Sequence, residues 1–178
     1  MEEKAMSETQ FNQWLDQLVT LRLPLWQQLP EFDLYMDQVI TETDHYLHPL
    51  GIEPLTKSMV NSYVKRKIIK RPKKKQYTRA HLAEIIIVSL FKTIFPLETI
   101  HTGINQARQT LDASQAYDQF VNQINAELAS LTQPDSQSLF TADDNIAAIT
   151  QKAAIRAVLY QLISQHALLL EKKTEPVK

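Results

Sequence analysis

Apolar residues recur at three- and four-residue spacing along most of the chain, a pattern that predicts amphipathic helices rather than strands. Ser7 and Gln10 have the spacing of a capping box, so a first helix is predicted from Ser7 to about Leu21. Asp33 is predicted to cap a second helix that ends near Gly51. The chain contains only two glycines, which agrees with an all-helical protein.

The middle of the chain predicts two helices that flank a short loop or hairpin. Thr56 is the predicted cap of a short helix over 57–68, and Thr78 is the predicted cap of a longer one over 79–95. Between them, the stretch RPKKKQYT contains Pro72, which excludes a continuous helix. The 79–95 segment is apolar around most of its circumference, so we expect it to lie at the centre of the fold.

The C-terminal half predicts three further helices. Pro96 suits the start of the first, and the second is predicted over 113–131. The polar segment 132–140 is predicted to be a loop, after which Thr141 and Asp144 resemble a capping box that opens a long helix. The wide apolar face of this long helix suits a neighbouring helix or a second subunit. The predicted fold class is therefore all-α, a helical bundle with at most a short β-hairpin.

Charge is distributed unevenly, although the formal net charge is only -1. The window from Pro54 to Ala83 holds ten basic residues and no acidic residue, whereas the remainder holds nine basic and twenty acidic residues. Like charges repel unless a partner neutralises them, so this window predicts a region that binds a polyanion. A lone run of lysines is most often a solvated surface, and the prediction therefore depends on the helix beside the run.

Several classes of function lack their sequence signatures. The chain contains no cysteine, which excludes disulfides and thiolate metal sites. It contains no phosphate-binding glycine loop, no G-x-S-x-G and no H-E-x-x-H, so we expect neither an enzyme nor a cofactor. His45 and His48 have a spacing that suits a metal, but without further recognisable ligands we expect an ordinary pair of histidines near a helix end.

The sequence also predicts a cytoplasmic protein with no membrane partner. The N-terminal residues lack the basic start, apolar middle and cleavage site of a secretory signal. The most apolar segment, 82–95, is too short to cross a bilayer as a helix and carries Glu84 and Lys92. No small-molecule ligand is identifiable from the sequence.

The helix predicted over 57–68 has one apolar face and one polar face. Met59, Val60, Tyr63 and Val64 share the first, because their spacing is i, i+1, i+4, i+5. The opposite face carries amides, hydroxyls and cations but no carboxylate. In the DNA major groove Asn pairs with adenine and Arg with guanine, whereas Lys and Ser reach phosphates. This face therefore suits double-stranded DNA.

A basic hairpin that follows a recognition helix is the arrangement of a winged helix. Here the helix over 57–67 is predicted to enter the major groove, and the basic wing over 71–75 to lie on the phosphate backbone. The predicted DNA-binding residues are Lys57, Ser58, Asn61, Ser62, Lys65, Arg66, Lys70, Arg71, Lys73, Lys74, Lys75 and Arg79.

The runs LTKSMVNSYVKRKII, RPKKKQYTRAHLAEIIIVSLFK and FPLETI resemble the MerR-type winged helix. In that family a helix with a Tyr leads through a hydrophobic pair to a basic wing, a second Tyr, another helix and a phrase like GFSLEEI. Those places are taken here by Tyr63, Ile68, Ile69, Pro72, Tyr77, Leu82 and 95–100. Lys67 stands where MerR-type chains usually have glycine before the hydrophobic pair.

Together with LPEFDLYMDQVI, these runs resemble still more closely an uncharacterised family, a domain of unknown function from low-GC Gram-positive bacteria. The resemblance covers about 29–103 and implies a MerR-like DNA-binding transcriptional regulator with no known effector.

Three regions are predicted on this basis: an N-terminal helical extension (1–28), a winged-helix region (29–106) and a C-terminal helical region for packing or dimerisation (107–178). One winged helix offers few base contacts, so we expect a homodimer on two half-sites. The alternative is a helical adaptor, not an enzyme, that binds an acidic protein or RNA through the same basic patch.

Overall fold

The computed structural model describes residues 2–133, 141 and 143–174 of the 178-residue chain. Within this part, seven α-helices are joined by turns, two short 3-10 helices and two isolated β-bridges, which confirms the all-α prediction. The α-helices are α1 (Glu2–Leu18), α2 (Met36–Leu47), α3 (Lys57–Lys65), α4 (Arg79–Phe91), α5 (Leu97–Ala107), α6 (Ala113–Ser130) and α7 (Ile146–Thr174). The 3-10 helices are η1 (Trp26–Gln28) and η2 (His48–Leu50).

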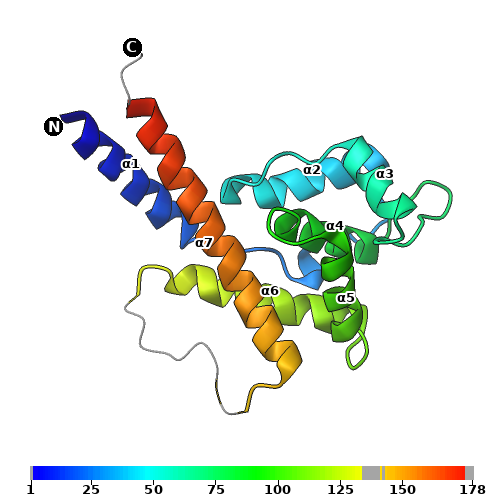
Figure 1. Cartoon of the computed structure of the whole chain (residues 1–178). Helices are drawn as coiled ribbons and strands as arrows, with labels where there is room; N and C mark the ends of the chain where they lie inside the picture. Colours follow the sequence, from blue (N-terminus) through cyan, green and yellow to red (C-terminus); the bar gives the residue numbers. More distant parts are fainter. Residues whose placement is uncertain (1, 134–140, 142, 175–178) are drawn as a thin grey trace.

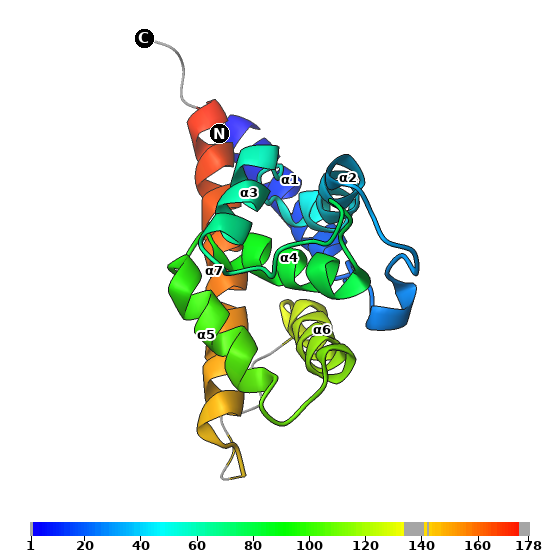
Figure 2. The same cartoon turned by 90° about the vertical axis from the view of Figure 1, so that its right-hand side faces the viewer.

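Helix α4 lies at the centre of the molecule, as its apolar circumference predicts. Helices α2, α5, α6 and α7 pack around it (Figure 1, Figure 2). Its Leu82, Ile85 and Ile86 are fully buried. The long helix α7 packs across α4, α5 and α6, and its C-terminal half packs against α1, with Trp14 stacked on His166 at 3.9 Å between ring centroids. The α1–α7 pair extends away from α3 (Figure 1).

The predicted starts of α3 and α4 are confirmed, and each has a local cause. The Thr56 hydroxyl accepts a hydrogen bond from the Met59 amide at 3.2 Å, which caps α3. Thr78 precedes α4, and its amide donates to Nδ1 of His81 at 3.0 Å. The hydrogen-bond acceptors for these amides lie within three residues of them, so the sequence alone identifies both helix starts.

The ends of α3 and α4 come earlier than predicted, at Lys65 rather than residue 68 and at Phe91 rather than residue 95. Helix α3 is closed by a Schellman motif, in which the Ile68 amide donates to the Tyr63 carbonyl at 2.9 Å and the Lys67 amide to the Val64 carbonyl at 3.1 Å. Lys67 has a φ of 59°, the left-handed conformation that this motif normally gives to glycine.

Three predicted helix starts are wrong. Helix α1 begins at Glu2, so Ser7 lies inside it and does not cap it. The start of α2 is satisfied by Gln38, whose side chain accepts from the Tyr35 amide at 2.9 Å, and not by Asp33. Helix α7 begins at Ile146, with Asn145 accepting from the Ala148 amide at 2.9 Å, so the predicted cap lies a turn too early.

The Thr141–Asp144 pair instead closes a turn before α7, with the Thr141 amide donating to Asp144 at 2.8 Å. The predicted loop over 132–140 falls largely on residues 134–140, which lie outside the described residues. Helices α5 and α6 begin directly after Pro96 and Asp112, in agreement with their predicted positions.

The buried apolar side chains form one continuous cluster. It includes Leu18 from α1, Val60 from α3 and Leu159 from α7, and so draws on all three predicted regions. The boundaries at 28/29 and 106/107 stay a prediction. By length and composition alone, Ile146–Glu171 of α7 would suffice to cross a membrane, a property that core helices of soluble proteins share.

Candidate nucleic-acid interface

A tight turn presents the lysines of the basic loop. The Gln76 amide donates to the Lys73 carbonyl at 2.9 Å, and Lys74 and Lys75 between them have φ angles of 50° and 63°. Positive φ at both central residues is characteristic of a type I′ turn, which favours Asn-Gly. The predicted hairpin is therefore a two-residue turn with an isolated bridge rather than a pair of strands.

The base of this turn is fixed to the body of the protein. Leu34, just before α2, and Tyr77 exchange two backbone hydrogen bonds of 2.8 Å each. Both side chains are buried in the core, with exposed fractions of 3%. The base of the lysine turn is thus bonded to the core, whereas Lys73, Lys74 and Lys75 are exposed.

In the described part of the chain, three residues other than glycine adopt the left-handed conformation, and all three are lysines. They are Lys67, Lys74 and Lys75. The left-handed region costs an L-residue roughly 1–2 kcal/mol, and glycine or asparagine would relieve that cost. The basic region therefore keeps lysine side chains at three places where the backbone alone would favour another residue.

Helix α3 keeps the two faces predicted for it. Val60 and Tyr63 are buried against the core. The exposed face carries polar residues that were predicted to contact DNA, namely Lys57, Ser58, Asn61, Ser62 and Lys65. No carboxylate belongs to this helix, so its exposed face bears only cations, hydroxyls and an amide.

A groove of about 1230 Å³ runs between α3, the lysine turn and α5. We refer to it as the basic groove. Six of the twelve predicted site residues line it, namely Asn61, Lys65, Lys70, Arg71, Lys74 and Lys75. Lys67 and Arg108 also line it, and Glu84 is the one acidic residue among the described residues that do so. The groove therefore gathers positive charge from three separate segments.

The other six predicted residues lie outside the lining of the basic groove. Ser58, Ser62 and Lys73 are exposed to solvent. Lys57 pairs with Asp37 of α2 at 2.6 Å, and both side chains are largely exposed.

Arg66 pairs with Glu98 at the start of α5. A hydrogen bond from the backbone amide of Glu98 to its own carboxylate, and next the contact with Arg66, hold the pKa of Glu98 below its usual range. Arg79 is half-buried, donates to the Pro30 carbonyl at 3.2 Å and lies 5.9 Å from the centre of the Trp26 ring. Its guanidinium therefore makes contacts within the protein that stabilise the fold.

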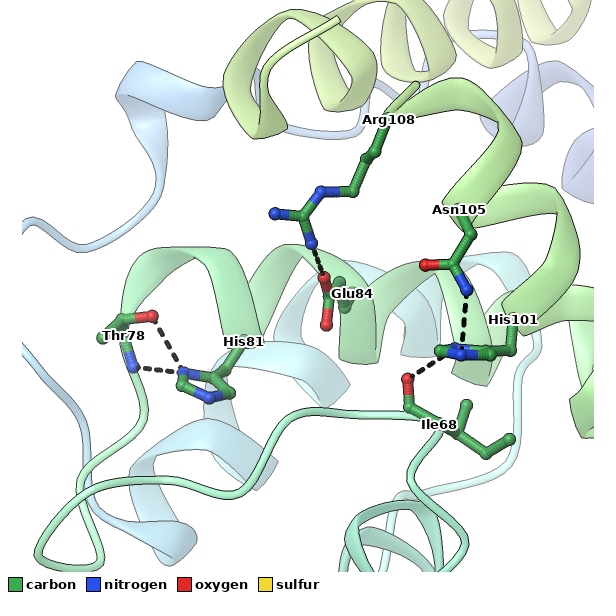
Figure 3. A network of polar contacts seen from close by, with 7 residues as sticks. All are labelled: Ile68, Thr78, His81, Glu84, His101, Asn105 and Arg108. Atoms are coloured by element: carbon green, nitrogen blue, oxygen red, sulfur yellow. Dashed lines mark hydrogen bonds and ion pairs between the residues drawn. The ribbon is translucent and has the colours of Figure 1, made fainter. Parts of the chain in front are cut away.

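Helix α5 connects the wall of the groove to the turn after α3 (Figure 3). Nδ1 of His101 lies 3.0 Å from the Ile68 carbonyl, and Nε2 lies 2.9 Å from the Asn105 amide nitrogen. A carbonyl oxygen only accepts hydrogen bonds, so Nδ1 carries the proton and Nε2 accepts from Asn105. This arrangement fixes the position of Ile68, the residue after the left-handed Lys67.

Glu84 and Arg108 form an ion pair of 2.6 Å between α4 and the end of α5 (Figure 3). Burial raises the pKa of Glu84, and the nearby Arg108 guanidinium opposes that shift. The carboxylate side chain is 16% exposed, so it adds little negative charge to the groove surface. Burial likewise lowers the pKa of His81, which keeps the imidazole neutral and able to accept from the Thr78 amide.

The sequence analysis missed two cations of the groove. Lys67 lay within the basic window and inside the helix predicted over 57–68 but was not among the predicted DNA-binding residues, and a lysine at a glycine position was the available signal. Arg108 is 24 residues from its partner Glu84 and enters the groove only through the packing of α5 on α4. Among the described residues, no group of three or more metal-ligand side chains is present.

Residues 24–124 match the sequence profile of a family described as Domain of unknown function (DUF1836). This range contains α2 to α5, the basic groove and most of α6. Neither the curated proteins nor the solved structures include a match to the chain.

Proposed function

Because the chain belongs to the family Domain of unknown function (DUF1836), whose name assigns no activity, we propose its function from the basic groove: the protein binds double-stranded DNA and regulates transcription. Helix α3 enters the major groove, and one phosphate strand lies between α3 and the lysine turn. The supporting observation is the set of three left-handed lysines, Lys67, Lys74 and Lys75. Backbone strain of this kind clusters at binding sites, where it aims side chains at a partner.

The charge of the basic groove suits a polyanion. Six cations from the basic window between Pro54 and Ala83 line it, namely Lys65, Lys67, Lys70, Arg71, Lys74 and Lys75. Glu84, the one acidic residue of the described chain that lines the groove, is neutralised by Arg108. If about five to seven cations contact phosphates, the logarithm of affinity falls with the logarithm of salt concentration at a slope of roughly -4.5 to -6.

The polar face of α3 supplies the base contacts in this proposal. Asn61 lies at the border of the groove and carries an amide that matches the donor and acceptor edge of adenine. Arg66 has to exchange Glu98 for a base or a phosphate. That exchange is inexpensive, because an exposed ion pair contributes little to stability in water.

The structure around Lys67 supports the finer proposal of a MerR-like winged helix. The Schellman motif places Lys67 in the left-handed region at the position where MerR-type chains usually have glycine. A lysine turn then takes the place of the wing, and its base pairs with Leu34. On this reading the protein is a cytoplasmic regulator that binds as a homodimer to two half-sites.

A selection of duplexes from a random library with the purified chain tests the proposal. We expect an enriched site whose affinity exceeds that for random DNA. Asn61→Ala should reduce the ratio between the two affinities, whereas Lys73→Ala, Lys74→Ala and Lys75→Ala combined should weaken both alike. RNA and polyglutamate serve as competitors. No preference for duplex DNA over polyglutamate would indicate an adaptor for an acidic protein, and preference for RNA would equally reject the DNA proposal.

A further inference from the structure

A cavity of about 360 Å³ lies on the other side of α5 from the turn after α3. It is lined by α4, α5, α6 and the N-terminal part of α7 and is partly open to solvent. Most of its wall is apolar, including Ile87, Phe91, Ile100 and Phe120. Its volume falls at the lower end of the range for small-molecule sites, roughly 300–1,000 Å³, and an apolar wall with few polar groups is the usual lining of such sites.

Two side chains of the wall can donate further hydrogen bonds. Nε2 of Gln151 on α7 is buried and has no hydrogen-bond partner among the described residues. A buried donor without a partner destabilises the folded state, and an acceptor on a ligand would remove that penalty. Arg108, at the edge of the cavity, uses one nitrogen to contact Glu84 at 2.6 Å and has further N–H groups available.

We propose that this cavity binds a small apolar carboxylate. The apolar body of the ligand fills the space between α4, α5 and α6. Its carboxylate accepts from the Arg108 guanidinium and, after a rotation of the Gln151 side chain towards the cavity, from Nε2 of Gln151. Both donors favour an anionic acceptor, and the apolar wall disfavours a ligand with several polar groups.

Helix α5 provides a route from this cavity to the basic groove. Ile100, Gly103, Ile104 and Arg108 of this segment line the cavity, whereas His101 bonds to the Ile68 carbonyl in the turn after α3. Ile104 and Arg108, together with Glu84, line both the cavity and the basic groove. A ligand that recruits Arg108 therefore alters a groove wall. Regulation of DNA binding by this route rests on the proposed function.

The chain offers a substitution that fills the cavity with little risk to folding. A Cβ added to Gly103 meets no heavy atom within 4 Å, and its φ is not in the left-handed region. Gly103→Leu thus places a larger side chain in the cavity and also favours the helix. Gln151→Leu removes the unpaired donor while keeping a similar volume. The matched control is Ala126→Leu, on an exposed position of α6 that does not line the cavity.

The probe is 2-naphthoate, compared with 2-naphthol, and binding is measured by calorimetry and by amide chemical shifts of the full chain. We expect saturable binding of 2-naphthoate, weaker binding of 2-naphthol, and no change in Ala126→Leu. Gly103→Leu should abolish binding, and Gln151→Leu should weaken it about tenfold, the loss expected from one hydrogen bond. No saturable binding, or equal binding in Gly103→Leu and the native chain, overturns the site.

The coupling has its own readout. At saturating 2-naphthoate we expect the amide resonances of Lys67 and Ile68 to shift in the native chain and to stay unchanged in Gly103→Leu. Occupancy without these shifts overturns the coupling. A native chain that binds 2-naphthoate and shows both shifts but has no affinity for duplex DNA overturns the proposed function and leaves the ligand site standing.

Discussion

Replacing Lys74-Lys75 by Asn-Gly should make the protein more stable and a weaker DNA binder. Both lysines have positive φ, 50° and 63°, where each L-residue loses on the order of 1 kcal/mol relative to a residue suited to that region. Asparagine tolerates the left-handed region, and glycine is unstrained there but loses roughly 0.5–1 kcal/mol of additional chain entropy on folding. The net gain in the free energy of unfolding is therefore about 1 kcal/mol.

A gain of this size raises the Tm of a chain of this length by about 2–4 °C. The same substitution removes two cations from the basic groove. If both contact phosphates, the salt slope of DNA binding becomes shallower by about 1.8. Differential scanning calorimetry measures the first effect, and fluorescence anisotropy of a labelled duplex at several salt concentrations measures the second.

The double variant Lys74→Ala with Lys75→Ala separates strain from charge. It removes the same two cations but leaves a side chain with a Cβ at both left-handed positions, so the slope should fall equally while the Tm stays close to that of the native chain. A Tm for the Asn-Gly variant at or below that of the alanine variant would refute the strain argument. An unchanged salt slope in both variants would refute the contact of this turn with phosphates.

Three further predictions concern single residues. Glu98→Gln removes the carboxylate that Arg66 has to leave before it contacts DNA, so affinity for any duplex should rise; anisotropy titrations that show an unchanged affinity would argue that Arg66 does not reach DNA. Burial lowers the pKa of His81 below 6.5, so the folded state binds fewer protons than the unfolded state and stability falls as the pH decreases through and below 6.5. Urea unfolding at pH 7 and pH 5 should show a smaller difference for His81→Gln, which retains an acceptor for the Thr78 amide, than for the native chain; equal differences would contradict this origin. Thr56→Ala removes the cap of α3 and should lower the free energy of unfolding by about 1 kcal/mol in chemical denaturation, and a loss below the error of that measurement would show that the cap contributes nothing.

Sequence reasoning succeeded where the physical cause is local. The starts of α3 and α4 depend on Thr56 and Thr78 and on amides at most three residues away. The central position of α4 follows from its apolar circumference. The two faces of α3 follow from its helical periodicity, so the exposure of Asn61 and Lys65 was predictable.

Sequence reasoning failed where a distant segment decides the outcome. Arg79 belongs to the basic window but is held by Pro30 and Trp26, which are about fifty residues away in the chain. Arg66 faces Glu98 only because α5 packs beside the end of α3. The start of α1 at Glu2 shows a further limit, since a capping-box spacing does not exclude that the helix continues through it.

The pairing of α1 with the C-terminal half of α7 brings the two ends of the described chain to one corner of the molecule, away from α3 and the lysine turn (Figure 1). A fluorophore, a surface linker or a fused protein attached at either end would thus leave the basic groove open. Immobilised or tagged forms of this chain are consequently suitable for every binding measurement described above.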